Sequence, residues 1–385
     1  MSAAGIIAFV ATVLFMVLFH EFGHFITARK FGIKVEEFFI GFGPKIFSKR
    51  RGETEFGLKA ILLGGYVRIA GMNPFQDIDE ADKDRVFGAK PAWQRAIVLA
   101  AGSFTHFILA TLVFTILFSA IGVHDVTKPL PRLQEVNLKV NGKPGPGVVA
   151  GLKAGDTVVA ISGKPVHKWQ EVRSEIRANP GKPLVFEIKR GARNLNIPVT
   201  PVQAKVPSGP GKNAKVIIAG QIGVAPEFEV VRESLPAALW HGLRSTGGAM
   251  KDSVKGIAQI FSPKGLAGVF KALGASGKRP LSADQPVGLV GGARLAGQAT
   301  SAGAFESLIR FLAVFIVFVG VINLAPLPPL DGGHLAVLAF EKISRHKVDM
   351  RKVIPVAGAV VAFFVVLSVA LLYLDIFRPI SNPFQ

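Results

Sequence analysis

The 385-residue sequence contains no cysteine, so disulfide bonds and thiolate metal ligands are both excluded. Acidic residues are scarce as well: 26 Asp and Glu stand against 45 Lys and Arg, for a net charge of +19. Such an excess suits nucleic-acid binding, but no basic motif with interleaved aromatic residues accompanies it. We therefore expect no nucleic-acid partner and assign the positive charge to contact with anionic lipid headgroups.

Charge is missing altogether from Ala4 to Phe19, and no basic segment precedes this stretch as it would in a cleavable signal peptide. Hydrophobic residues make up 50% of the chain, too many for an ordinary soluble protein. Four apolar runs are long enough to cross a bilayer as helices, at about residues 4–28, 96–123, 311–330 and 353–374. We expect the first run to remain in the mature protein. We expect the lipid bilayer to surround the four apolar runs.

Lys and Arg near the ends of these runs predict how the chain crosses the membrane. Arg29, Lys30 and Lys34 follow the first run, and five basic residues lie between the third and fourth. Because short basic loops stay in the cytoplasm, we expect residues 29–95 and 331–352 there. Both termini and the long connection between the second and third runs are then expected outside.

The motif His20-Glu21-Phe22-Gly23-His24 lies near the end of the first run. Two histidines four residues apart share one face of a helix and can hold one metal ion, and the adjacent Glu21 can serve as general base. With one coordination position left open for water, this arrangement is typical of zinc hydrolases. Ionisable groups are costly to bury in a membrane helix, which favours a functional site over histidines satisfied by packing.

The third run contains three prolines within four residues, and Asp331-Gly332-Gly333-His334 follows them. Prolines cannot continue a regular helix, and a helix broken at membrane depth is tolerated only where it is buried or lines a polar cavity. The first and third runs cross in the same direction. Asp331 is therefore expected in a turn, as the third zinc ligand near the cytoplasmic boundary, with His334 as a lower-ranked competitor.

Two further polar residues lie within the apolar runs. Asn323 is interpreted as a contact for the substrate backbone or for an oxyanion, or alternatively as a helix-packing amide. His106 is the one titratable group of the second run, and it follows Gly102-Ser103-Phe104-Thr105. It is interpreted either as a packing histidine or as a partner of the metal site or the substrate.

The first loop, residues 29–95, is rich in apolar residues for a cytosolic segment. Gly41-Phe42-Gly43-Pro44 is typical of a tight turn. Alternating and apolar stretches in Glu53–Met72, around Gly64-Gly65, predict a β-hairpin that dips towards the membrane. The hairpin either covers helix ends or offers an edge strand to an extended substrate.

The long second loop begins with a compact module. Residues 150–166 closely resemble the core of bacterial PDZ domains, and the pattern predicts strands and one helix at 157–161, 184–190, 194–199 and 169–179. The resemblance implies an α+β module that binds or filters peptides, or one that only packs.

A Pro/Gly-rich linker is expected after this module, at 207–213. Helices are expected at 234–261 and 265–273, lying on the outer membrane surface or packed on the module.

Taken together, these motifs resemble the site-2 protease family of intramembrane zinc metalloproteases, in its bacterial RseP-like branch, here with a single PDZ-like module. The match covers the zinc motif, the membrane-associated loop, the module and the Asn-x-x-Pro-x-Pro-x-Leu-Asp-Gly pattern at 323–332. The family implies Zn²⁺ bound by His20, His24 and Asp331, with Glu21 as catalytic base and Asn323 in contact with substrate. One departure is that the family's Gly-Pro-x-x-Asn reads Gly-Ser-Phe-Thr-His at 102–106.

The resemblance also implies a bacterial inner-membrane enzyme that cleaves membrane-spanning proteins, such as trimmed anti-sigma factors or remnant signal peptides. A membrane scaffold acting through the PDZ-like module is the alternative; a zinc transporter is disfavoured because repeated halves are absent. The expected fold is a four-helix polytopic membrane protein with a membrane-associated β-hairpin and an inserted α+β PDZ-like domain. Its expected segments are 1–28, 29–95, 96–123, 124–204, 205–310, 311–330, 331–352 and 353–385.

Overall fold

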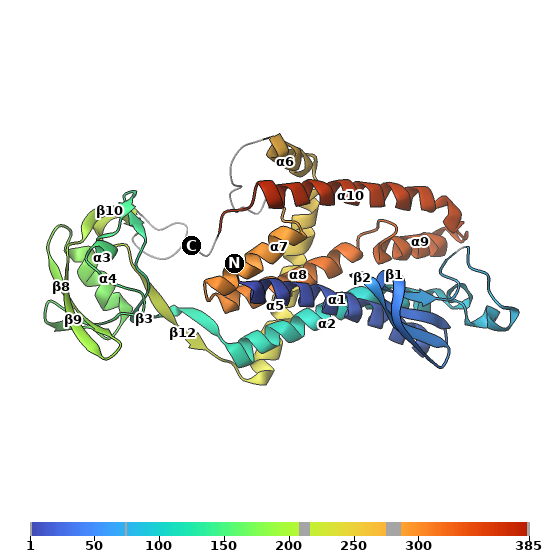
Figure 1. The fold of residues 1–385 in the computed structure, drawn as a ribbon, viewed down its shortest axis with the longest axis horizontal. Helices are drawn as coiled ribbons and strands as arrows, with labels where there is room; N and C mark the ends of the chain where they lie inside the picture. The colour runs from blue at the N-terminus through green and yellow to red at the C-terminus, as the bar shows by residue number, and fades with distance from the viewer. Residues whose placement is uncertain (1, 74, 208–215, 275–285, 383–385) are drawn as a thin grey trace. The chain divides into compact units, whose positions relative to one another are not determined.

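The computed structural model describes residues 2–73, 75–207, 216–274 and 286–382 (Figure 1). They form two compact units, one made of Met1–Ile121 with Glu233–Gln385 and the other of Gly122–Arg232. Apart from Pro207, the linker predicted at 207–213 lies outside the described residues.

The first unit is mainly helical. Its long helices are α1 (Ala3–Lys30), α2 (Ala92–Ile116), α5 (Leu235–Ile260), α6 (Pro263–Gly274), α7 (Leu289–Ser301), α8 (Phe305–Asn323), α9 (Asp331–Ser344) and α10 (Ile354–Phe377). A π-helical turn, Leu117–Ile121, extends α2, and short 3-10 turns lie at Glu80–Arg85, Phe87–Ala89 and Met350–Lys352.

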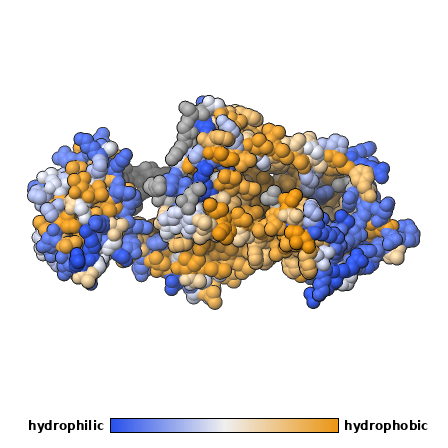
Figure 2. Space-filling view, in the orientation of Figure 1, coloured by the Kyte–Doolittle hydropathy of each residue, from blue (hydrophilic) through white to orange (hydrophobic). Residues whose placement is uncertain are grey.

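Four of the described helices are long and apolar enough to cross a membrane: α1, α2 with its π-turn, α8 and α10. This confirms the expected number of spans, and Figure 2 shows hydrophobic residues gathered over the helical part of this unit. The third span differs from its predicted bounds of 311–330. It begins at Phe305 and ends at Asn323, because Pro326 and its neighbours cannot continue the helix.

Helices α1, α2 and α8 pack against one another and form the centre of the unit. Close approach of α1 to α2 depends on Gly23, where an added Cβ would lie 2.6 Å from the carbonyl oxygen of Ala101. Around the contacts with α8, Met16, Ala110 and Ile316 form a buried apolar cluster. The helix that carries the zinc motif is therefore held on two sides by apolar contacts.

Helix α5 crosses α2 and α8 and is packed against both (Figure 1). Its buried face is made of small residues, and Thr246 shares a 3.0 Å hydrogen bond with Thr111 of α2. The opposite face exposes Leu239, Trp240 and Leu243. Helix α5 therefore belongs to the first unit.

A long antiparallel hairpin, β1 (Val35–Arg51) and β2 (Thr54–Ile69), joins α1 to α2. Both strands fold back on themselves, so that Phe38 pairs with Phe56 on one side and Val67 on the other. Gly41 and Gly64 permit the bends, with φ of +86° and +133°. The prediction of a hairpin contained within Glu53–Met72 is therefore wrong, because this stretch pairs mainly with the preceding strand.

The second unit, Gly122–Arg232, is an α+β module. Its elements are β3 (Val123–Glu135), β4 (Lys139–Val140), β5 (Lys143–Pro144), α3 (Pro146–Val149), β6 (Thr157–Ile161), β7 (Lys164–Pro165), α4 (Trp169–Ala178), β8 (Leu184–Arg190), β9 (Arg193–Val199), β10 (Val202–Pro207), β11 (Val216–Gln221) and β12 (Ala225–Val231). The main sheet has the order β12-β3-β6-β8-β9, with β7 beside β6. The strands and helix predicted from 157 to 199 are confirmed.

This module extends past its expected end at residue 204, because β12 returns and pairs along β3 from Val123 to Glu135. Its core contains Leu133, Ile161, Val172 and Phe186, all almost fully buried. The buried carboxylate of Asp156 accepts hydrogen bonds from the Arg190 guanidinium and from the Lys153 backbone. The module therefore has a core of its own.

Candidate metal centre

Three side chains distant in sequence converge where α1, α2 and the start of α9 meet. The Nε2 atoms of His20 and His24 are 3.2 Å apart, and Asp331 Oδ2 lies 3.4 Å from each of them. Among the described residues, these three form the one group of histidines and carboxylates close enough to hold a metal ion. Asp331 is a member of this group, and His334 is not.

The triangle of donor atoms fits a tetrahedral zinc ion. Zinc bonds of about 2.0–2.1 Å at tetrahedral angles separate two ligand atoms by about 3.3–3.4 Å. Asp331 Oδ2 is buried but has no hydrogen-bond partner among the described residues. A buried carboxylate oxygen without a partner is costly, and a cation between the three donors would satisfy it.

The second ring nitrogen of each histidine faces a hydrogen-bond partner. His24 Nδ1 lies 2.8 Å from the carbonyl oxygen of Val98, and His20 Nδ1 lies 3.1 Å from His106 Nε2. A carbonyl can only accept, so His24 carries its proton on Nδ1 and directs the lone pair of Nε2 at the other donors. Such partners orient the ligands of most metal sites.

Gly102 of α2 provides the space that the two imidazoles occupy. An added Cβ would lie 2.4 Å from His24 Nε2 and 2.6 Å from His20 Cε1. Any side chain at this position would displace the donor atoms themselves. In the sequence, Gly102 stands out only as part of a motif, and its position four residues before His106 is the one signal of this role.

Asp331 is not in a turn as expected but is the first residue of α9. Residues 324–330 fold back over the start of this helix, and a Cβ at Gly332 would lie 2.1 Å from the carbonyl oxygen of Leu324. At Gly333 it would lie 2.3 Å from the nitrogen of Pro328. The two glycines are therefore what allows the proline-broken segment to deliver Asp331 to the histidines.

Glu21 lies beside the second strand of the hairpin. An added Cβ at Gly65 of β2 would be 3.5 Å from Glu21 Cγ, so strand and helix touch at this point. The next residue, Tyr66, donates its hydroxyl proton to Glu37. Burial and this carboxylate raise the pKa of Tyr66 to about 12, so the phenol stays protonated at physiological pH. The hairpin forms one wall beside Glu21.

The other three residues predicted to belong to the site or to border it are His106, Asn323 and His334. His106, only 1% exposed, lies directly behind His20. Asn323 is the last residue of α8 and is partly exposed, with no side-chain hydrogen bond among the described residues. His334, one turn into α9, does not belong to the group of three donors.

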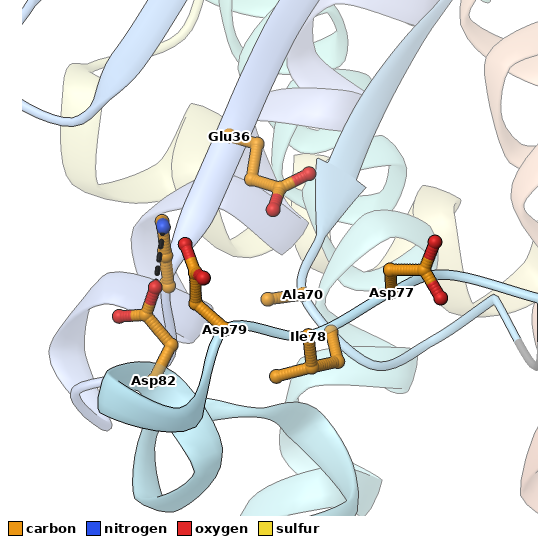
Figure 3. A pocket seen from close by; sticks show the side chains of 7 residues that line it. Glu36, Ala70, Asp77, Ile78, Asp79 and Asp82 are labelled. Carbon is orange, nitrogen blue, oxygen red and sulfur yellow. Dashed lines mark hydrogen bonds and ion pairs between the residues drawn. The ribbon is translucent and has the colours of Figure 1, made fainter.

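A separate cavity of about 320 Å³ lies beside the first loop and is lined mainly by acidic side chains (Figure 3). Lys34 pairs with Asp82 there, and Glu36, Asp77 and Asp79 contribute further carboxylates. Hydrogen bonding to Asp82 raises the pKa of Lys34, which remains a cation. None of these carboxylates belongs to a group tight enough to hold a metal within the described part of the chain.

Comparisons with known proteins agree over nearly the full length. The model of peptidase family M50 matches residues 8–368. The chain is 30% identical over 356 residues to zinc metalloprotease Rip1 of Mycobacterium tuberculosis H37Rv, covering 89% of this chain and 87% of that protein. Rip1 of Mycolicibacterium smegmatis is 31% identical, with 99% of both chains covered. The regulator of sigma-W protease RasP of Bacillus subtilis is 27% identical, covering 97% and 98%.

Proposed function

This chain belongs to peptidase family M50 and is a zinc-dependent intramembrane metalloprotease, and we propose that His20, His24 and Asp331 bind its zinc ion while Glu21 is the catalytic base. The observation that carries this assignment is the triangle of donor atoms with sides of 3.2–3.4 Å. Asp331 Oδ2, one corner of this triangle, is buried and has no hydrogen bond among the described residues beyond its 3.4 Å contacts with the two imidazoles, which supports the same assignment.

The chemistry is peptide-bond hydrolysis inside the membrane. When bound, zinc supplies a Lewis acid that activates water and polarises the scissile carbonyl group. Glu21 accepts the proton of the attacking water and then transfers it to the nitrogen of the leaving amine. The Asn323 amide donates a hydrogen bond to the carbonyl oxygen as negative charge develops on it. A substrate helix must unwind before its peptide bond reaches Glu21.

The substrates proposed here are membrane-spanning proteins, among them trimmed anti-sigma factors and remnant signal peptides. RasP of Bacillus subtilis is named a regulator of sigma-W protease, which supports this class. We propose that the site opens towards the cytoplasm and that both termini and residues 122–232 are outside. The basic residues after α1 and in the segment after α9 support this orientation.

The module Gly122–Arg232 is proposed to be PDZ-like and to bind or screen peptides before cleavage. Its strand and helix order, together with the Gly-Leu-Lys-Ala-Gly-Asp sequence before β6, supports this assignment. A peptide would bind by adding a strand to the edge of the sheet. Titration of the full chain with labelled C-terminal peptides is the direct measurement, and binding that survives deletion of this module would contradict the proposal.

The decisive experiment for the zinc site is cleavage of a reporter transmembrane helix by the purified protein in detergent. Wild type, Glu21→Gln and wild type with a zinc chelator are compared, with bound zinc measured in each. We expect Glu21→Gln to retain zinc and to lose about 10²–10⁴-fold in rate, the usual contribution of a general base. Cleavage at the wild-type rate by Glu21→Gln would remove Glu21 from the mechanism.

A further inference from the structure

The two histidines of the proposed zinc site are supported in different ways from behind. His24 Nδ1 faces a backbone carbonyl, that of Val98, at 2.8 Å. His20 Nδ1 instead faces a side chain, His106 Nε2, at 3.1 Å. His24 is therefore oriented by the backbone of α2, whereas His20, which also has the Gly102 backbone beside it, is contacted in addition by a side chain that can be replaced.

We propose that His106 is a positioning residue, which accepts the Nδ1 proton of His20 and so holds that ligand in the tautomer whose Nε2 binds zinc. The proposal rests on the zinc site proposed above and extends it to the residue behind it. His106 does not touch the reacting atoms, and its effect passes through His20.

The tautomers of the pair follow from hydrogen-bond accounting. A zinc ligand that binds through Nε2 keeps its proton on Nδ1, so His20 is the donor and His106 Nε2 the acceptor. The proton of His106 is then on its own Nδ1. That atom is buried and has no partner in the described part of the chain, so the only hydrogen bond of this ring is the one to His20.

Packing holds the His106 ring in the place that this hydrogen bond requires. The side chain is 1% exposed, and its ring centroid lies 5.1 Å from that of His20. Gly320 of α8 lies directly against it: an added Cβ would be 2.8 Å from His106 Cβ and 3.0 Å from Phe107. Three helices thus meet at this ring, and α8 leaves room for it only because residue 320 is glycine.

The acceptor is neutral, unlike the carboxylate that often occupies this position behind a metal ligand. It fixes the tautomer of His20 without adding negative charge next to Asp331. An amide side chain has an oxygen that can accept the same proton. The first test of the proposal is therefore whether glutamine, whose side-chain oxygen reaches the position of His106 Nε2, can replace His106 where an apolar residue of similar size cannot.

Zinc affinity of the full-length protein in detergent is the measurement, made by competition with a chromophoric chelator after zinc removal. We expect His106→Leu to weaken binding by about 10–100-fold, the usual effect of losing a partner behind a metal ligand, and His106→Gln to stay close to wild type. Ser103→Ala is the matched control, because its hydroxyl is buried on the same helix without a partner.

Thermal unfolding of the zinc-free proteins separates positioning from general packing: His106→Leu and His106→Gln, which are similar in size, are expected to unfold alike. If His106→Leu does not fold, Gly320→Ala replaces it, since it displaces the ring and is expected to weaken zinc binding. Zinc affinity equal to wild type in His106→Leu, or equally weak binding in His106→Gln, overturns the proposal. Zinc retained by His20→Ala would instead refute the zinc site itself.

Discussion

Each of the two units buries a carboxylate, and the two carboxylates differ in their hydrogen bonding. Asp156 of the module has no exposed surface, and both of its oxygens accept hydrogen bonds of 2.7–2.8 Å from Arg190 and Lys153. Asp331 of the helical unit retains 17% side-chain exposure, and its buried Oδ2 has no hydrogen-bond partner among the described residues. A satisfied carboxylate stabilises a fold, whereas one left incomplete beside two imidazoles is prepared for a cation.

Replacing Asp331 should have the largest effect. Asp331→Asn keeps the shape but removes the charge, so zinc affinity should fall by more than the about 10–100-fold typical of a lost outer partner, and cleavage with it. Stability of the zinc-free protein should change less than zinc affinity, because there the carboxylate loses only its 3.4 Å contacts with the two imidazoles. Zinc titration and thermal unfolding check this. Loss of stability without loss of zinc affinity would mean that Asp331, like Asp156, stabilises the fold and does not bind a cation.

Gly102→Ala tests the close contact behind the histidines and should rank second. The new methyl group would lie within 2.4–2.6 Å of both imidazoles, so the donor atoms must move apart. We expect zinc affinity to fall by at least about 10-fold, as for other disturbances of ligand orientation. The matched change Gly247→Ala, on α5 with no atom within 4 Å, should leave zinc binding unchanged. Equal zinc affinity in both variants would contradict this reading of Gly102.

Asp156→Asn should affect folding alone. It leaves the partly exposed Arg190 guanidinium without its anionic partner and should cost about 1–3 kcal/mol in the free energy of unfolding, the usual effect of breaking a buried hydrogen-bonded pair. Chemical denaturation of the full chain, followed by a probe in the module, measures this. Zinc affinity should match wild type, and a parallel loss of zinc would show that the two carboxylates are not separate in role.

The smallest effect is expected for Gly247→Ala itself. Gly247 lies inside α5 with open space around it, so alanine meets no clash there and favours the helix. A gain of about 0.5–1 kcal/mol in stability follows from the lower backbone entropy of the unfolded chain. Thermal unfolding in detergent is the readout. A loss of stability would indicate that the space beside Gly247 is occupied in the protein, so that only glycine fits there.

Much of the proposed zinc site depends on local periodicity, which the sequence shows directly. His20 and His24 share a helix face at any i, i+4 spacing, and the run of prolines breaks a helix wherever it occurs. The hairpin was harder, because the sequence pattern marks strands but not their partners. Phe38 pairs with both Phe56 and Val67, and pairings across such a distance depend on bends at Gly41 and Gly64.

By itself, the sequence determined the four apolar spans, the two histidines on one face and the break before Asp331, since each follows from spacing along one segment. Only the tertiary structure decided that Asp331 Oδ2 reaches both histidines, that Gly102 makes room for them, and that His106 faces His20. These contacts join α1, α2 and α9, and no local pattern encodes the distance between helices. That distance is set by which small side chains let the helices approach.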